Sequence, residues 1–472
     1  MHDLCVVVVN LQMESEMSLI EPRTLKGFRD YPPELMIPRE RMLETCRRVY
    51  RSYGFAPIDT PALEYTEILL GKIDAESEVQ RIVYRFKDHG DRDVALRFDL
   101  TVPFARFAAQ HIGKVGTPFK RYHMGPVWRG ENTSHGRYRE FWQCDFDTIG
   151  TISNAADIET ALVIHDLMAA LDVQFGFGGF QVRVNNRLVL NGVLEGLGIG
   201  DKAAAVLRAL DKLPKIGAEK VSEEMTAAAG ATPQQAERVL ALAGARGGNA
   251  EILAAVERDF GSNPKTADGV AKLRELLAVA KTAGIPDGRI LIDLSICRGL
   301  DYYTGTIFET FLDRLQGIGS VCSGGRYDNL ASLYTKQVLP GVGASLGLDR
   351  FLAAMEELNR LERISTPAPV FIAQFDANRL GDYQRIARLL RAAGIGAEVF
   401  PEPKKIGQQL KYADARGFKV ALIAGDREFA DRVWNLKDLS KERGVGDQPK
   451  EGVAVAESEL FPAIHAILNA GR

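Results

Sequence analysis

The sequence predicts an α/β protein with more than one domain, and three stretches carry that prediction. Residues 120–150 contain two apolar runs separated by a polar, glycine-containing loop, which is typical of a β-hairpin. Residues 185–284 are rich in Ala, Leu, Lys and Glu, a composition that favours helices. From residue 370 onward, strand-like and helix-like segments alternate, which indicates a further α/β domain.

Length and composition are those of a globular protein with several cores. The chain has 472 residues, of which 46% are hydrophobic and 26% charged, so we expect two or three domains. The net charge of −3 gives no general signal for nucleic acid, and RNA binding would therefore need a local basic patch. No apolar run approaches the roughly 20 residues of a membrane span, so we expect no membrane association and a cytoplasmic location.

The cysteines and histidines show no metal-binding or disulfide pattern. The five cysteines are scattered without a CxxC pair, and the seven histidines lack HxxxH spacing. We therefore expect reduced thiols and no protein-built metal site. Residues 1–18 contain only a short apolar run, Val6–Val9, without a basic flank. We interpret this stretch as a disordered or accessory extension, or as sequence upstream of a later start at Met13 or Met17.

Several elements can be predicted from periodicity and from their end signals. Residues 33–53 have apolar residues at helical spacing, and Gly54 predicts the end of that helix. Phe55–Pro61 then predicts a short strand. A second helix is expected from Asn154 to Leu171, capped by Asn154 or Ser153, and a strand follows at Gln181–Val184.

A hairpin is also expected at Val83–Pro103, around an Asp-His-Gly-Asp turn. On its second strand Arg97, Asp99 and Thr101 alternate, so we expect them to share one face. Such a face is either solvated or the lining of a polar pocket. In a pocket, Asp99 would accept a hydrogen bond from an ammonium group or an imidazole N–H.

The hairpin at residues 120–150 and the sequence before it are basic. Between Lys114 and Arg139 the only acid is Glu131, against six basic residues, namely Lys114, Lys120, Arg121, Arg129, Arg137 and Arg139. An electropositive hairpin suits an anion such as a phosphate chain or an RNA end. The alternative is a solvated hairpin that happens to be basic.

Two further stretches have open interpretations. The helical stretch 185–284 is either a lid or RNA-facing arm, or a structural spacer. Strand-like runs at Ile290–Ile296 and Thr306–Phe311 flank a glycine turn that contains Arg298. A buried cation needs a partner, so Arg298 either pairs with Asp301 or serves as an anion site beside an aromatic pocket.

After the Pro-containing linker 364–369, strands and helices alternate. The expected strands are Val370–Gln374, Ala397–Phe400, Val420–Ala424 and Trp434–Leu436, and the expected helices are Asp382–Ala393, Ile406–Arg416 and Leu460–Leu468.

Three of these segments, taken in order, resemble the signatures of class II aminoacyl-tRNA synthetases. The helix at 33–53 with the strand ending at Pro61 resembles the first signature. The second signature is matched by Trp128-Arg129-x-Glu131 followed by Arg137-x-Arg139-Glu140-Phe141-x-Gln143, which resemble it in order. This sequence has Trp128 at a position where Phe is commoner. The third is resembled by the glycine-rich strand and helix at 341–351.

Two more motifs narrow the resemblance to the histidyl-tRNA synthetase family. They are Arg298-Gly299-Leu300-Asp301-Tyr302-Tyr303 and Ser323-Gly324-Gly325-Arg326-Tyr327-Asp328. The resemblance runs in order from about Leu25 to Leu358. It implies an α+β catalytic domain at 19–365, in which helices flank an antiparallel sheet and a helical insertion lies at about 186–285. It also implies a C-terminal α/β anticodon-binding domain at 366–472, and a homodimer.

The resemblance implies roles for individual residues. At the ATP site, Arg129 would hold the α-phosphate and the substrate carboxylate, and Arg298 would face the α-phosphate from the other side; these two are the expected catalytic residues. The remaining ATP contacts would be Arg137 and Arg350 on the β- and γ-phosphates, Glu131 on the adenine side and Phe141 stacked on the ring.

The histidine site implied by the resemblance is a polar pocket with an aromatic wall. Tyr302, Tyr303 and Tyr327 would frame the imidazole, and Asp147 stands where some relatives have Glu. The other implied contacts are Asp99, Leu100, Thr101, Arg129, Gln143 and Arg298.

The implied activity has two steps, which use ATP with Mg²⁺, L-histidine and tRNA. Histidine would react with ATP to give histidyl-adenylate and pyrophosphate, and the histidyl group would then move to the 3′ end of the tRNA. The alternatives are a regulatory paralogue that binds an effector and a sensor of uncharged tRNA. The enzyme is favoured because the four arginines of the motifs, Arg129, Arg137, Arg298 and Arg350, are all present.

Overall fold

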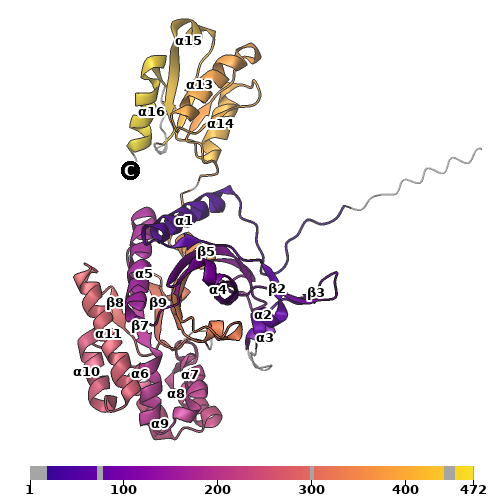
Figure 1. Ribbon diagram of the computed structural model, residues 1–472. Coiled ribbons are helices and arrows are strands. Elements are labelled where there is room, and N and C mark those ends of the chain that lie inside the picture. The colour runs from indigo at the N-terminus through magenta and orange to yellow at the C-terminus, as the bar shows by residue number, and fades with distance from the viewer. Residues whose placement is uncertain (1–18, 72–77, 298–301, 363, 441–451, 471–472) are drawn as a thin grey trace, which may run out of the picture.

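The computed structural model describes residues 19–71, 78–297, 302–362, 364–440 and 452–470, and Figure 1 shows their arrangement. Its central feature is an eight-stranded sheet with strand order β1-β5-β6-β11-β10-β9-β7-β8. The strands are β1 (Ala56–Pro57), β5 (Phe119–Trp128), β6 (Glu140–Ile149), β7 (Phe180–Asn186), β8 (Ile290–Ile292), β9 (Thr306–Leu312), β10 (Cys322–Tyr327) and β11 (Gly341–Gly347).

The centre of this sheet is antiparallel, as the sequence predicted. The expected hairpin is β5–β6, which pairs from Phe119 opposite Ile149 to Trp128 opposite Glu140. Only the edge strands β1 and β8 run parallel to their neighbours. The strand expected at Phe55–Pro61 is shorter than predicted, because β1 contains only two residues; the prolines at positions 57 and 61 have no N–H for a longer ladder.

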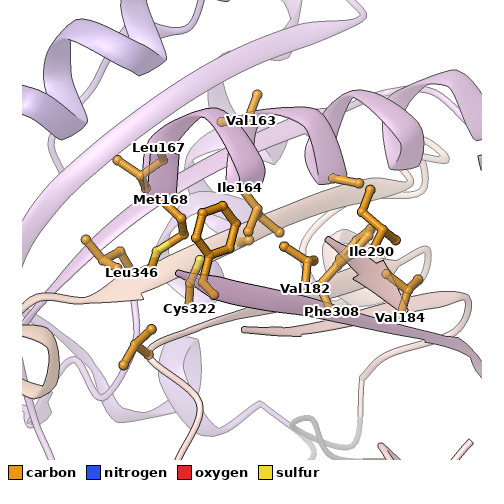
Figure 2. Packing of buried hydrophobic residues seen from close by; sticks show 14 of the residues in the cluster. Val163, Ile164, Leu167, Met168, Val182, Val184, Ile290, Phe308, Cys322 and Leu346 are labelled. Carbon is orange, nitrogen blue, oxygen red and sulfur yellow. The ribbon is translucent and has the colours of Figure 1, made fainter. Parts of the chain in front are cut away.

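Three helices cover one face of the sheet. They are α1 (Pro33–Ser52), α5 (Asn154–Phe175) and α12 (Leu348–Glu357), and Ser153 caps α5 by accepting a hydrogen bond from Ala155 N–H. Figure 2 shows Leu167 and Met168 of α5 packed against the apolar side chains of the strands, including Phe308 and Leu346. Burial of this apolar surface fixes which face of each strand points away from solvent.

A smaller sheet, ordered β2-β4-β3, lies beside the central one. It consists of β2 (Leu63–Tyr65), β3 (Arg85–Lys87) and β4 (Asp93–Leu96), and its helices are α2 (Thr66–Leu70), α3 (Glu78–Ile82) and α4 (Thr101–Val115). The hairpin expected at residues 83–103 is present as β3–β4. Its second strand is shorter than predicted, because β4 ends at Leu96 and Thr101 is already the first residue of α4.

Helices fill the stretch between β7 and β8. They are α6 (Arg187–Gly196), α7 (Ala203–Leu210), α8 (Leu213–Ala229, broken at Gly217), α9 (Pro233–Ala243), α10 (Asn249–Phe260) and α11 (Pro264–Thr282). Apolar residues of α7–α9 form a cluster of their own, to which Leu190 and Leu194 of α6 belong. Val189 and Val193 of α6 instead join the residues of α10 and α11 in the core around α5. The side chain of Asn249 also bonds the edge strand β8, donating to the Ile290 carbonyl at 2.8 Å and accepting from Ile292 N–H at 2.8 Å.

The C-terminal part contains a five-stranded sheet, ordered β13-β12-β14-β15-β16, with helices around it (Figure 1). Its strands are β12 (Val370–Ile372), β13 (Ala397–Val399), β14 (Val420–Ile423), β15 (Val433–Asp438) and β16 (Val453–Ala456), and its helices are α13 (Leu380–Ala392), α14 (Ile406–Arg416), α15 (Asp426–Asp431) and α16 (Leu460–Asn469). All the expected elements are present; β16 and α15 were not expected. In the part of the chain that the structure describes, no helix is both long and apolar enough to cross a membrane.

The core packing makes a prediction about stability. Leu167 is fully buried in the middle of α5, whereas Val173 on the same helix is 90% exposed. We expect Leu167→Ala to lower the free energy of unfolding by about 3 kcal/mol, because the cavity that it leaves cannot close completely. Val173→Ala is the matched control and should change it by less than about 0.5 kcal/mol. Urea titration followed by circular dichroism measures both, and equal effects would contradict the packing described.

Candidate functional site

The two faces of the central sheet carry different side chains. On β6, Cys144 and Phe146 point into the apolar core with α5, so the residues that alternate with them along the strand point to the opposite face. Those residues are Gln143, Asp145 and Asp147. Cross-strand pairing extends the polar face, because Arg121 of β5 lies opposite Asp147, and His123 of β5 lies opposite Asp145.

Glycines keep this face open where β11 crosses it. Gly343 lies opposite Asp147 of β6, and a Cβ atom at Gly343 would overlap Oδ1 of Asp147. A Cβ atom at Gly341 would overlap the ring of Tyr327 on β10 in the same way. Because neither glycine has a positive φ, they are required by space and not by backbone conformation.

The residues expected to bind ATP line one cavity of about 140 Å³. They come from separate elements: the end of β5, the loop 130–139, the start of β6 and the start of α12. Its lining includes Arg129, Glu131, Arg137, Phe141 and Arg350, together with Gln143.

Charge in this cavity is mainly positive. Glu131 forms ion pairs with Arg137 and, at 4.0 Å, with Arg129. Arg129 is held by a 2.9 Å hydrogen bond from Nε to the Phe98 carbonyl, and its guanidinium lies 5.1 Å from the centre of the Phe141 ring. Arg350 donates to the Ser320 carbonyl at 2.8 Å. Three guanidinium groups and one carboxylate at one cavity suit a polyanion.

The segment Asp99–Thr101 corrects one prediction. Arg97, Asp99 and Thr101 do not share a strand face, because the chain turns into α4 after Leu96. The Asp99 carboxylate accepts a hydrogen bond from Val102 N–H at 3.1 Å, which stabilises the first turn of the helix. Arg97 has a structural role instead, since it donates to the carbonyl of Thr60 at 2.6 Å.

The three tyrosines of the predicted histidine site lie together. The ring of Tyr302 meets those of Tyr303 and Tyr327 edge to face, at 5.1 Å and 5.9 Å between centres. Tyr302 donates to Asp99 at 3.4 Å, and Tyr327 donates to Asp147 at 2.7 Å. Burial raises the pKa of each tyrosine, so all three hydroxyls stay protonated.

Arg121 is the buried cation of this region and was not predicted as a site residue. It is fully buried, forms an ion pair with Asp147 at 2.7 Å and donates to the Leu100 carbonyl at 3.2 Å. Asp145 lies 3.9 Å from it, and burial raises the pKa of Asp145 to about 7. Burial, followed by the charge of Arg121, lowers the pKa of His123 to about 3, so His123 is neutral.

A signal for these missed residues exists in the sequence. Arg121 and His123 alternate on β5 as Gln143, Asp145 and Asp147 do on β6, and the residues between them, Tyr122, Cys144 and Phe146, are buried. Polar residues at period two within buried strands indicate a lined pocket. One expected site residue, Arg298, lies outside the described residues, and so does Asp301, its partner in the alternative interpretation.

Comparison with protein-family models identifies both parts of the chain. Residues 27–351 match the model described as histidyl-tRNA synthetase, and residues 370–464 match the model of an anticodon binding domain. The chain belongs to the histidyl-tRNA synthetase family. A member of this family is an ATP-dependent aminoacyl-tRNA synthetase, so the chain is an enzyme that ligates histidine to tRNA.

Relatives and solved structures agree with this family. A histidine–tRNA ligase from Rhodopirellula baltica is 58% identical over 422 residues, which cover 89% of this chain and 94% of the relative. The crystal structure of histidyl-tRNA synthetase from Nostoc sp. PCC 7120 has a TM-score of 0.83 at 32% identity, and covers 95% of this chain and 100% of that one. A protein from Bacillus halodurans described as an ATP phosphoribosyltransferase regulatory subunit/histidyl-tRNA synthetase is 22% identical and has a TM-score of 0.68, covering 83% and 97%; it shares the fold alone.

The buried Asp99 makes stability depend on pH. Burial raises the pKa of Asp99 from 3.8 to about 6 in the folded synthetase. A raised carboxyl pKa contributes stability below pH 4 that is lost as the pH rises through 6. We therefore expect the stability of the wild type relative to Asp99→Asn to fall by on the order of 3 kcal/mol between pH 4 and pH 7. Urea unfolding of both proteins at the two pH values measures this difference, and parallel pH profiles would contradict it.

Proposed function

We propose that the cavity described above binds ATP and that the adjoining polar face of the sheet binds histidine. The observation that carries this proposal is the position of Arg129. Its guanidinium lines the cavity, while its Nε atom bonds the Phe98 carbonyl, next to Asp99. One fixed cation therefore borders both regions, where a carboxylate and an α-phosphate would have to meet.

In the ATP region we assign Arg129 to the α-phosphate, and Arg137 and Arg350 to the β- and γ-phosphates. Glu131 contacts the adenine side and Phe141 stacks on the ring. The convergence of these residues on one cavity supports the assignment. Arg298, which belongs to the stretch that the structure does not describe, is proposed from its motif alone as the second catalytic arginine.

In the histidine region we assign the carboxylates of Asp99 and Asp147 to the cationic and N–H groups of the substrate. Gln143 lies on the same face of β6 as Asp147, and Thr101 is the first residue of α4. The carbonyl of Leu100 borders the site and already accepts a hydrogen bond from Arg121. Tyr302, Tyr303 and Tyr327 form the wall against which a flat imidazole ring packs.

The proposed reaction begins when a carboxylate oxygen of histidine attacks the α-phosphorus of ATP. A new bond forms between this oxygen and the α-phosphorus, the bond between the α-phosphorus and the oxygen that bridges to the β-phosphate breaks, and pyrophosphate leaves with that oxygen. Fixed guanidinium groups stabilise the negative charge that accumulates on the phosphoryl oxygens. In the second step the terminal ribose hydroxyl of tRNA attacks the carbonyl, and AMP leaves. We assign no protein side chain as the base for this step.

Mg²⁺ is proposed to accompany ATP. Within the described ranges no group of three or more His, Cys, Asp or Glu residues could hold a metal ion. The cavity has the single carboxylate of Glu131, which fits Mg²⁺ bound largely through phosphate oxygens and water. When bound, Mg²⁺ would neutralise charge on the phosphates, in addition to what Arg137 and Arg350 supply.

We further propose that residues 19–365 form the catalytic domain, with the insertion at about 186–285, and that residues 366–472 bind the tRNA anticodon. Separate apolar clusters within residues 368–468 support the boundary. Residues 1–18 form an N-terminal extension in this division. The buried free thiols of Cys46, Cys144 and Cys322 suit the cytoplasm, where we place the enzyme.

A homodimer is also proposed, as expected for the family. The small sheet offers an apolar surface for it. Leu63 and Tyr65 of β2 are 40% and 48% exposed, and Phe86 of β3 is 48% exposed. Tyr65 and Phe86 both lie opposite Val94 of β4, so the exposed rings share one face.

Pyrophosphate exchange tests the proposed reaction. With ATP and Mg²⁺, the full chain should exchange labelled pyrophosphate into ATP when histidine is present, and with none of the other nineteen amino acids. Sites that hydrogen-bond a polar side chain reject analogues by about 10⁴-fold or more. A folded chain that binds histidine without exchange would instead support the regulatory or sensor alternative.

Removal of the C-terminal part tests the domain assignment. A chain that ends at Pro367 should retain histidine-dependent exchange and lose most of its tRNA charging, because the cavity lies wholly before that residue. Exchange and single-turnover charging are measured on the same preparation. Equal loss of both activities would show that residues 368–472 are needed for the fold or the dimer and would contradict a separate tRNA-binding domain.

A further inference from the structure

A segment before α1 lies against the loop that leads from β5 to β6. The Gly27 carbonyl accepts a hydrogen bond from Arg139 N–H at 2.8 Å, and the Lys26 carbonyl accepts one from the Arg139 guanidinium at 3.5 Å. Gly27 has φ +87°, and a Cβ atom there would lie 2.7 Å from Thr133. The close approach requires glycine, so this segment and the loop fit together directly.

The contact continues as a stack of alternating aromatic rings and guanidinium groups. Arg29 lies between the rings of Tyr138 and Tyr31, at 4.8 Å and 4.5 Å from their centres. Arg39 of α1 lies on Tyr31 at 4.5 Å and on Trp142 of β6 at 4.9 Å. Each guanidinium is thus in cation–π contact with two rings. We call these five residues the cation–π stack.

Hydrogen bonds connect the stack to α12. Arg29 donates to the Tyr138 hydroxyl at 2.7 Å and lies 3.5 Å from Glu356 of α12. Tyr31 donates to Asp349 at 2.6 Å, and the same carboxylate accepts from the backbone N–H of Trp142 at 2.6 Å. Asp349 is almost fully buried, so these bonds have little competition from water.

Three of the elements that the stack joins, namely the loop 130–139, β6 and α12, carry residues of the ATP cavity. Tyr138 lines the cavity itself and follows Arg137. Trp142 lies between Phe141 and Gln143, and Asp349 precedes Arg350 in α12. The stack therefore fixes the loop 130–139 relative to α12, and with it the two arginines assigned to the β- and γ-phosphates.

We propose that Arg29 is a positioning residue of the ATP cavity, which holds the loop bearing Glu131 and Arg137 at a fixed distance from the helix bearing Arg350. This inference rests on the proposed ATP-binding role of the cavity. Arg29 does not line the cavity itself and acts through Tyr138, which does. A planar guanidinium can stack on both rings and still donate to the hydroxyl, whereas a lysine ammonium cannot do all three.

Arg29 is also the member of the stack that can be replaced with least risk to the fold. The Arg39 side chain is only 4% exposed and forms an ion pair with buried Asp349 at 3.1 Å, so its removal would leave an unpaired buried charge. The Arg29 side chain is 21% exposed, and its partner Glu356 is 33% exposed. Arg41 on α1, which forms an exposed ion pair with Glu362 at 3.3 Å, provides a matched control.

The test is pyrophosphate exchange by full-length Arg29→Met, Arg29→Lys and Arg41→Met variants, with KM measured separately for ATP and for histidine. We expect Arg29→Met to raise KM for ATP about tenfold, the size of effect that a partly buried cation–π contact with a charged hydrogen bond has. KM for histidine should change by less than about twofold, because the stack does not touch the histidine region. Arg29→Lys should have an intermediate effect, and Arg41→Met none.

Thermal unfolding separates positioning from a general structural role. The expected result is a melting temperature of Arg29→Met within about 4 °C of the wild type, together with the raised KM for ATP. Two results would overturn the inference: KM for ATP that stays within about twofold, or KM for both substrates that rises in parallel with a large loss of stability.

The Arg137→Ala variant distinguishes an error in this inference from an error in the proposed function. A wild type without histidine-dependent exchange, or an Arg137→Ala variant with unchanged KM for ATP, would refute the ATP assignment itself. If Arg137→Ala raises KM for ATP and Arg29→Met does not, the cavity binds ATP and only the role of Arg29 is wrong.

Discussion

The alternation of side chains across the central sheet is the constraint on which the site depends. Along β5, β6 and β11, every second residue packs under α5, and the residues between them point to the polar face. A register slip of one residue would move Asp145 and Asp147 into the apolar core and move Phe146 to the pocket. The cost of burying two carboxylates among apolar side chains excludes that pairing, so the core and the site enforce the same register.

The polar face of the sheet buries more carboxyl groups than arginines among the described residues. Arg121 is a fully buried cation next to Asp145 and Asp147. Among the described residues, Asp99 accepts hydrogen bonds from two neutral donors, the Val102 N–H and the Tyr302 hydroxyl. Burial raises the pKa of all three carboxyl groups. In the proposed histidine site, the ammonium group and ring N–H of the substrate would add positive charge and donors beside these carboxyl groups.

The fold could be predicted from the sequence wherever one element has a clear period and a clear end signal. The β5–β6 hairpin, α5 with its Ser153 cap, and α14 are of this kind. The segment at Asp99 was predicted wrongly. Its alternating pattern favoured a strand, but the Asp99 carboxylate accepts a hydrogen bond from a backbone N–H and so stabilises the start of a helix.

The site was predicted in part, for a related reason. The family motifs brought Arg129, Glu131, Arg137 and Arg350 to one cavity, as the structure also does. Arg121 was predicted only as one of several basic residues of the hairpin. Its burial could not be predicted, because it depends on contacts with Leu100 and Phe104 from another part of the chain. The cation–π stack joins residues more than a hundred positions apart, and no local period can indicate such contacts.

The contact of Asn249 with β8 gives the helical insertion a role in covering one edge of the central sheet. Its side-chain amide donates to the carbonyl of Ile290 and accepts from the N–H of Ile292, as the backbone of a neighbouring strand would. Exposed strand edges recruit strands from other molecules. Variation within α7–α9, which pack into a separate apolar cluster, leaves that edge covered, whereas loss of α10 uncovers it. The outer helices α7–α9 can therefore be altered without removing the cover of β8, whereas α10 cannot.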